Sequence, residues 1–177
     1  MKHVEESGMY FGDYPEEKFF GIENSELQKS VGEGIKTVEF ILLHKNRQFL
    51  FVEAKTTCPN AANKDEDEQK KEKFEKYYHD ISEKFYDSLQ MFLTSVLNKS
   101  SNNEGIGSEL IQDKDYTQKE ICFVLVIKNA KDISWLAGPR TELEHRLKKL
   151  CKIWKAKILV LNYELAVEYG LVKADAT

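Results

Sequence analysis

Residues 35–55 read I-K-T-V-E-F-I-L-L-H-K-N-R-Q-F-L-F-V-E-A-K, and this stretch decides the fold. Two apolar runs, 35–43 and 49–55, flank polar turn residues, a pattern that predicts a β-hairpin. The second run ends on Glu53 and Lys55, which alternation along a strand puts on one face, roughly 6.5–7 Å apart. Burying both charges without compensation costs several kcal/mol, roughly, so a functional site that needs them would explain their presence.

A Glu-x-Lys triplet alone carries little information. The chain contains three, at residues 16–18, 53–55 and 68–70, and only the second stands at the end of an apolar strand. The alternative interpretation of this second triplet is an ion pair at a strand end, with both side chains reaching solvent.

Glu39 also interrupts an apolar run, and the register of the hairpin decides whether it can meet Glu53. If the two glutamates pair, His44 pairs with Gln48 and the loop is residues 45–47, Lys-Asn-Arg. Asparagine tolerates the left-handed conformation that such a loop requires. Two facing carboxylates repel each other unless a cation lies between them, and oxygen ligands of this kind suit Mg²⁺ or Mn²⁺.

Periodicity predicts the other elements, which alternate after the hairpin between helices and apolar strands. Before the hairpin we predict a short strand at 18–22 and a helix that is capped by Asn24 or Ser25 and ends near Val31. After it comes a long helix, whose apolar stripe is Phe74, Tyr78, Ile81, Phe85, Leu89, Phe92 and Val96, and then a central strand at 121–127. The last elements are a helix that begins at Gly138 and Pro139 with a stripe from Leu143 to Trp154, a strand at 157–161 and a helix at 165–172. We therefore predict an α/β fold, a mixed central sheet flanked by helices, in a single domain over residues 1–177. Its core spans about 18–165, and residues 1–17 are peripheral.

The stretch from Val38 to Lys55 resembles the core hairpin of the PD-(D/E)XK nuclease superfamily. In that group an acidic residue on one strand is followed, across a turn, by (D/E)-x-K on the next. The resemblance implies a restriction endonuclease-like αβββαβ core with the motif hairpin at residues 35–55. One departure is that Glu39, preceded by Val38, stands where the family usually has aspartate preceded by proline.

The resemblance also implies a set of site residues. Glu39, Glu53 and the backbone carbonyl of Ala54 would hold Mg²⁺ or Mn²⁺, and Lys55 would hold the attacking water or help to deprotonate it. Glu26 best matches a glutamate that many members carry on the first helix, and Glu23 and Glu33 compete with it. Contacts to nucleic acid are expected from a glutamine in the helix after the motif and from basic residues of a later helix: Gln90, Lys148, Lys149, Lys152 and Lys155.

Composition sets limits on function. The net charge is −4, so the whole chain is not a basic nucleic-acid binder, although basic residues outnumber acidic ones from 121 to 177. Three scattered cysteines argue against a disulfide framework or a zinc site. No apolar run is long enough to span a membrane and the first residues lack a secretory pattern, so we expect a cytoplasmic protein.

The function expected from these observations is a metal-dependent nuclease that hydrolyses phosphodiester bonds, in DNA rather than RNA, in repair or in defence against foreign DNA. A catalytically inactive module of the same fold that binds nucleic acid or protein is the first alternative. A plain structural domain, with Glu53 and Lys55 as a surface pair, is the second. Nucleic acid is the expected partner, and the sequence leaves a homodimer open.

Overall fold

A five-stranded mixed sheet forms the centre of the computed structural model, which describes residues 1–60, 67–97, 99, 102–112 and 116–174. The strand order is β3-β4-β5-β6-β7. β3, β4 and β5 pair antiparallel, whereas β5, β6 and β7 are parallel. The strands are β3 (Phe19–Phe20), β4 (Phe40–His44), β5 (Gln48–Lys55), β6 (Glu120–Ile127) and β7 (Lys157–Asn162).

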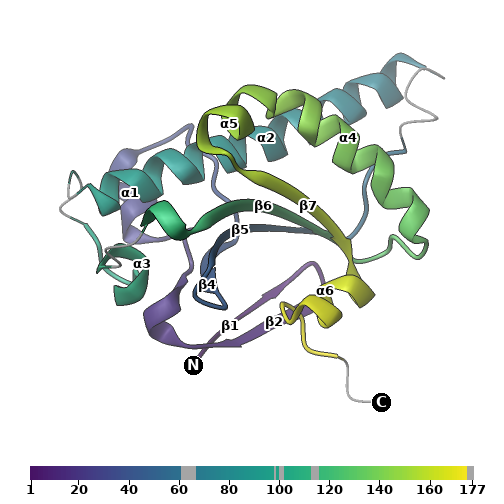
Figure 1. The fold of residues 1–177 in the computed structure, drawn as a ribbon. Helices are drawn as coiled ribbons and strands as arrows, with labels where there is room; N and C mark the ends of the chain where they lie inside the picture. The colour runs from purple at the N-terminus through teal and green to yellow at the C-terminus, as the bar shows by residue number, and fades with distance from the viewer. Residues whose placement is uncertain (61–66, 98, 100–101, 113–115, 175–177) are drawn as a thin grey trace.

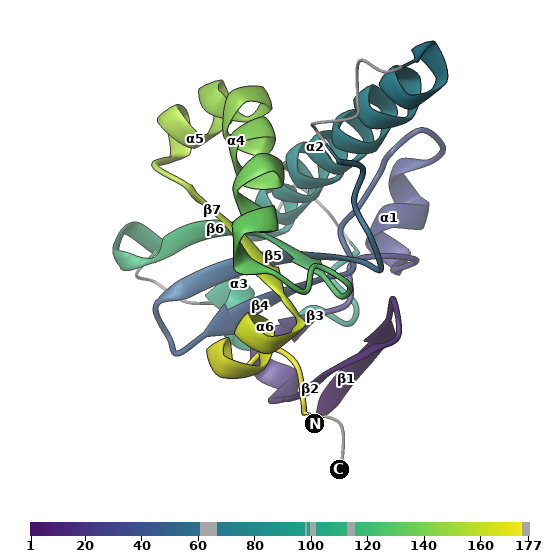
Figure 2. The ribbon, with the colours of Figure 1, turned by 90° about the vertical axis from the view of Figure 1, so that its right-hand side faces the viewer.

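Different elements cover the two faces of this sheet (Figure 1). One face carries α1 (Glu26–Val31), α2 (Glu68–Val96), α4 (Ala137–Arg146) and α5 (Lys148–Trp154). The other carries the hairpin of β1 (Lys2–Glu6) and β2 (Met9–Tyr14), together with α6 (Tyr163–Tyr169). Figure 2 shows the same layers from the side, with the β1–β2 hairpin below the sheet and α2 above it. The short elements are α3 (Ser108–Gln112) and the 3-10 turns Glu16–Lys18, Tyr116–Gln118 and Ile133–Leu136. The predicted α/β fold with a mixed sheet flanked by helices is confirmed.

Alternation along the strands builds two apolar cores. On β5, Phe49 and Phe51 point to the α2 side, whereas Leu50 and Val52 point to the β1–β2 side. The strand at 121–127 is buried on both faces, as its continuous apolar sequence predicts. Glu53, two residues after Phe51, therefore points toward α2.

The hairpin has the register that pairing of Glu39 with Glu53 would require. His44 pairs with Gln48, so the loop is the three residues 45–47. Lys45 and Asn46 both adopt positive φ, at 49° and 56°. The odd loop length keeps the odd-numbered residues of both strands on the α2 side.

The first strand of the hairpin is shorter than predicted, because β4 begins at Phe40 instead of residue 35. Two residues of the segment before it bond to α2. The Lys36 N–H donates to the Asp87 carboxylate at 3.0 Å, and the Val38 N–H donates to Ser88 Oγ at 2.9 Å. These two bonds hold the segment that carries Glu39 against the helix.

Two other regions differ from the prediction. Residues 1–17 are not peripheral, because Met9, Phe11 and Tyr14 of the β1–β2 hairpin are buried against the sheet. The helix predicted from Gly138 to Trp154 is two helices that meet at Leu147, and the Trp154 side chain is exposed instead of buried.

The order of elements departs in part from the αβββαβ pattern that the resemblance implies. Two strands, β4 and β5, lie between α1 and α2, and the third antiparallel strand, β3, precedes α1. Among the described residues, no helix is both long and apolar enough to cross a membrane.

Candidate functional site

Two buried carboxylates converge where β4 begins and β5 ends. The Glu53 side chain is fully buried and that of Glu39 is 5% exposed. Regular pairing of the strands stops at Phe40 and Val52, and the Glu39 N–H donates to the Val52 carbonyl at 3.0 Å. Glu39 and Glu53 are therefore not a regular cross-strand pair, but their carboxylates reach one common cation.

That cation is the ammonium of Lys84, on the inner side of α2. Its Nζ lies 3.0 Å from both carboxylate oxygens of Glu53 and 3.6 Å from Oε1 of Glu39. The Lys84 side chain is only 18% exposed. Burial lowers the pKa of Lys84, but the charges and hydrogen bonds of the surrounding glutamates outweigh it, so the pKa is raised overall. Lys84 is charged and compensates the buried carboxylates.

Lys55 completes the motif on β5. Its Nζ lies 2.6 Å from Oε1 of Glu53, and one third of its side chain remains exposed. The predicted position of Glu53 and Lys55 on one face is therefore confirmed, and the pair is neither wholly exposed nor wholly buried. Glu53 is shielded while Lys55 reaches toward solvent, so the ammonium can contact both the carboxylate and an incoming molecule.

Glu23 is the third carboxyl group of this cluster. Its Oε1 lies 3.9 Å from the Nζ of Lys84, and it shares a hydrogen bond with Glu39. Burial, this hydrogen bond and the charge of Glu53 raise the pKa of Glu39 to about 9. Burial also raises the pKa of Glu53, against the opposing charges of Lys84 and Lys55. At neutral pH the Glu39 carboxyl therefore holds a proton.

This proton makes the stability of the protein depend on pH. The pKa of Glu39 is about 9 in the folded chain against an ordinary value of 4.5, so the folded state binds the extra proton between these values. Stability from this group is complete below about pH 4.5 and is lost as the pH rises toward 9. We expect the melting temperature of Glu39→Gln, minus that of wild type, to increase by up to about 3–5 °C for each unit that the pH rises within this window. Thermal unfolding from pH 5 to 9 measures it, and a difference that is independent of pH would contradict the assignment.

The carbonyl of Ala54 points to the edge at which β4 no longer pairs. The Val52 carbonyl faces β4, where it accepts from Glu39, and the Lys55 carbonyl faces β6, where it accepts from Lys128 at 2.9 Å. Carbonyls alternate along a strand, so that of Ala54 faces the β4 side. The pairing of β4 with β5 ends before it, at Phe40 and Val52.

The donor atoms that meet here are of the types that bind a divalent cation through oxygen. Two carboxylates and a carbonyl are the ligand types that Mg²⁺ and Mn²⁺ prefer. In the structure, however, no three His, Cys, Asp or Glu side chains of the described ranges are arranged to hold a metal ion. The ammonium of Lys84 stands between the carboxylates and supplies the positive charge that a metal ion would supply.

Glu26 and Gln90 lie outside this cluster. The carboxylate of Glu26 is half exposed and forms an ion pair with Lys29 at 2.6 Å within α1. Gln90 is on α2, as predicted, but its side chain is exposed, whereas its neighbour Leu89 is buried. Glu23, one turn before Glu26 and outside the helix, is the N-terminal glutamate that reaches the site.

Three lysines of α5 and Lys155, which caps it, lie at the other end of the sheet. All four, Lys148, Lys149, Lys152 and Lys155, are exposed. The helix leads into β7 at Lys157, which pairs with Cys122 near the start of β6, whereas Lys55 pairs with Ile127 at the end of β6. The predicted phosphate contacts from these lysines are therefore remote from the carboxylates.

Sequence reasoning missed Lys84, although a signal for it exists. Lys84 lies three residues after Ile81 and four before Ser88, both of which are buried on the inner side of α2. A charged residue at helical spacing within an apolar stripe indicates a buried partner of opposite charge.

Comparison with protein-family models, with curated proteins and with solved structures found no match to this chain.

Proposed function

We propose that this chain is a metal-dependent nuclease that hydrolyses phosphodiester bonds in DNA. The observation that carries the proposal is the convergence of Glu39 and Glu53 beside Lys55, whose ammonium lies 2.6 Å from Glu53. The function and the choice of DNA follow from the resemblance of the hairpin to the PD-(D/E)XK nucleases. The site opens at the carboxyl end of β5, where Lys55 reaches solvent and a phosphate can approach.

Each residue has a chemical role in this proposal. Glu39, Glu53 and the Ala54 carbonyl would hold Mg²⁺ or Mn²⁺, which supplies charge neutralisation at the phosphate and makes a water molecule more acidic. The Lys55 ammonium donates a hydrogen bond to the attacking water and stabilises the negative charge that develops on the phosphate. Glu53 keeps that ammonium in place.

Glu39 and Glu23 control the proton of the site. Glu39 must give up its proton to act as a ligand, because a protonated carboxyl is a poor donor to a divalent ion. Glu23 shares the hydrogen bond with Glu39 and is 40% exposed, so it links this proton to solvent. Because the proton and the metal ion compete for Glu39, the concentration of metal ion needed for cleavage should fall as the pH rises.

One observation favours a second function, a binding module without catalysis. Lys84 already compensates the charge of Glu53, because its Nζ lies 3.0 Å from each carboxylate oxygen, so the buried charge needs no metal ion. A protein whose nuclease site had fallen out of use would retain such an internal pair. The same experiment separates the two functions.

The experiment incubates the protein with supercoiled plasmid and with single-stranded DNA in Mg²⁺, Mn²⁺ or EDTA. We expect cleavage in either metal ion and none in EDTA. Glu53→Gln should abolish cleavage, since it removes a ligand and the partner of Lys55. DNA binding without cleavage in any metal ion would support the second function and contradict the first.

The two N-terminal glutamates give a matched pair of variants. Glu23→Gln should lower the rate of cleavage by about tenfold to a hundredfold, because it disturbs the proton on Glu39 and its positioning. Glu26→Gln should leave the rate unchanged, since Glu26 pairs with Lys29 on the surface of α1. Initial rates on plasmid DNA measure both. The reverse order of effects would show that Glu26, and not Glu23, belongs to the site.

A further inference from the structure

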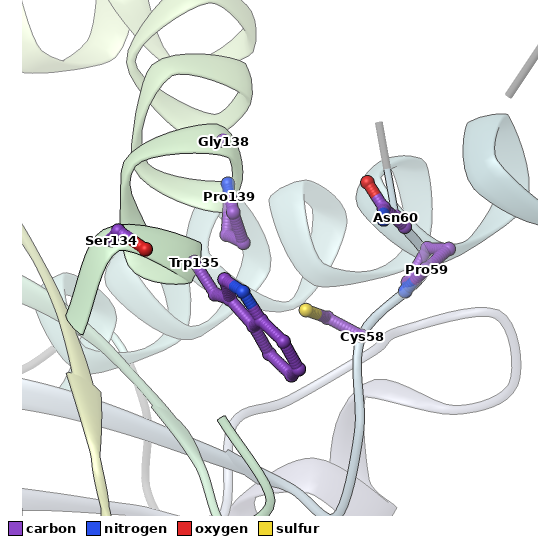
Figure 3. Close-up of a pocket in the computed structure, with 7 residues that line it drawn as sticks. All are labelled: Cys58, Pro59, Asn60, Ser134, Trp135, Gly138 and Pro139. Carbon is purple, nitrogen blue, oxygen red and sulfur yellow. The ribbon is translucent and has the colours of Figure 1, made fainter. Parts of the chain in front are cut away.

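A cavity of about 320 Å³ opens at the end of the sheet where β5 and β6 finish (Figure 3). Cys58 and Pro59 form one wall, in the segment that follows β5. Trp135 and Pro139 form the opposite wall, at the beginning of α4. In Figure 3 the indole of Trp135 projects from its turn toward Cys58, so the cavity has a flat aromatic wall.

Trp135 is held in an exposed position by its own turn. The 3-10 turn Ile133–Leu136 is capped by Asp132, whose carboxylate accepts from the Ser134 N–H at 2.8 Å. The backbone N–H of Trp135 donates to the Asp132 carbonyl at 3.0 Å. The side chain of Trp135 nevertheless remains 63% exposed, so its aromatic face can take up a flat ligand.

The cavity and the carboxylate site are neighbours. Cys58 is three residues after Lys55, so their Cα atoms are at most about 11 Å apart. The hydroxyl of Tyr77 donates to the Thr57 carbonyl at 3.2 Å and fixes the segment between them.

The turn after β6 carries Lys131, which is exposed and lies four residues before Trp135. Lys128 of the same turn is engaged elsewhere, because its ammonium donates to the Gly8 carbonyl of the β1–β2 turn. Lys55 and Lys131 each stand three residues before a residue of the cavity wall, Cys58 and Ser134. Positive charge near an aromatic wall is the combination that binds single-stranded nucleic acid.

We propose that this cavity binds an unpaired base of single-stranded DNA, stacked on Trp135, while a phosphodiester of the same strand lies at Glu39, Glu53 and Lys55. The proposal deepens the nuclease function and rests on it for the choice of DNA. The volume lies at the lower end of the range for ligand sites, which suits one base. Ser134 and Asn60 line the cavity as well.

The test measures binding without cleavage, in EDTA, by fluorescence anisotropy of a labelled single-stranded DNA oligonucleotide. Trp135→Ala should weaken binding by roughly one to two orders of magnitude, the usual loss for one base–aromatic stack. Trp135→Phe should retain most of the affinity, and wild-type tryptophan fluorescence should be quenched by the DNA. The matched control is Trp154→Ala, which removes the other tryptophan, on α5, and should bind as wild type does.

A second probe separates the base from the backbone. An abasic oligonucleotide of the same length should bind the wild type as weakly as the normal oligonucleotide binds Trp135→Ala. Three results would overturn the proposal. The wild type would bind both oligonucleotides equally well, Trp135→Ala and Trp154→Ala would bind DNA equally well, or the protein would not bind DNA at all. Plasmid cleavage in Mn²⁺ would then still support the nuclease function, whereas binding through Trp135 without cleavage would contradict that function alone.

Discussion

Replacing Lys55 with methionine is expected to lower the rate of DNA cleavage by about 10²–10⁴, while the chain still folds and binds metal ions. Methionine keeps the length of the side chain but removes the ammonium that lies 2.6 Å from Glu53. Glu53 remains compensated by Lys84 at 3.0 Å, so the fold does not depend on Lys55 alone. Initial rates on plasmid DNA in Mn²⁺ measure the loss.

The chain offers a matched control for this variant. Lys70 belongs to another Glu-x-Lys triplet, which lies in the first turn of α2, where Lys70 is exposed. Lys70→Met should cleave as fast as wild type. A Lys55→Met variant that retains activity within a few fold would exclude Lys55 from the chemistry, whatever its position on β5.

The second large effect is on stability. Lys84→Met leaves Glu53 fully buried with Lys55 as its remaining cation, and leaves Glu39 beside it. Breaking such a buried pair costs about 3 kcal/mol or more, so the melting temperature in EDTA should fall by roughly 6–12 °C at pH 8. The loss should be smaller at pH 5, because a protonated carboxyl needs no counter-charge. Mn²⁺ should raise the melting temperature of Lys84→Met more than that of wild type, since no ammonium then competes for the carboxylates.

Lys36 provides the control for this measurement. Its Nζ lies 2.6 Å from the carboxylates of both Asp80 and Glu83, which are on α2 like Lys84. About two fifths of each of these three side chains is exposed. Lys36→Met should cost less than about 1 kcal/mol, as exposed ion pairs do, and should not respond to Mn²⁺. Equal losses in the two variants would show that burial of Glu53 does not govern the stability of the cluster.

The hairpin could be predicted from the sequence because two constraints agree there. The apolar run 49–52 predicts the strand, and alternation along it puts Glu53 and Lys55 on one face. The loop 45–47 fixes the register between the two strands. The start of β4 could not be predicted. Its apolar residues read as strand, but the backbone of 36–38 bonds to Asp87 and Ser88, far along the chain.

The rest of the site depends on contacts between distant residues. Glu23 and Glu26 look alike in sequence, and only the packing of the segment before α1 brings Glu23 to Glu39 and turns Glu26 to solvent. Lys84 lies on α2, 31 residues after Glu53 in the sequence. Its position between the carboxylates follows from the way α2 packs on β5. The exposure of Trp135 follows from the 3-10 turn that carries it.

The central claim is that Glu39, Glu53 and the Ala54 carbonyl can hold a divalent ion. A crystal structure from crystals soaked in Mn²⁺, with anomalous diffraction data, tests it most directly. We expect one anomalous peak bonded to oxygens of Glu39 and Glu53, with the Lys84 ammonium displaced from between them. Lys84 still bound to both carboxylates at saturating Mn²⁺, with no peak beside Glu53, would contradict the claim.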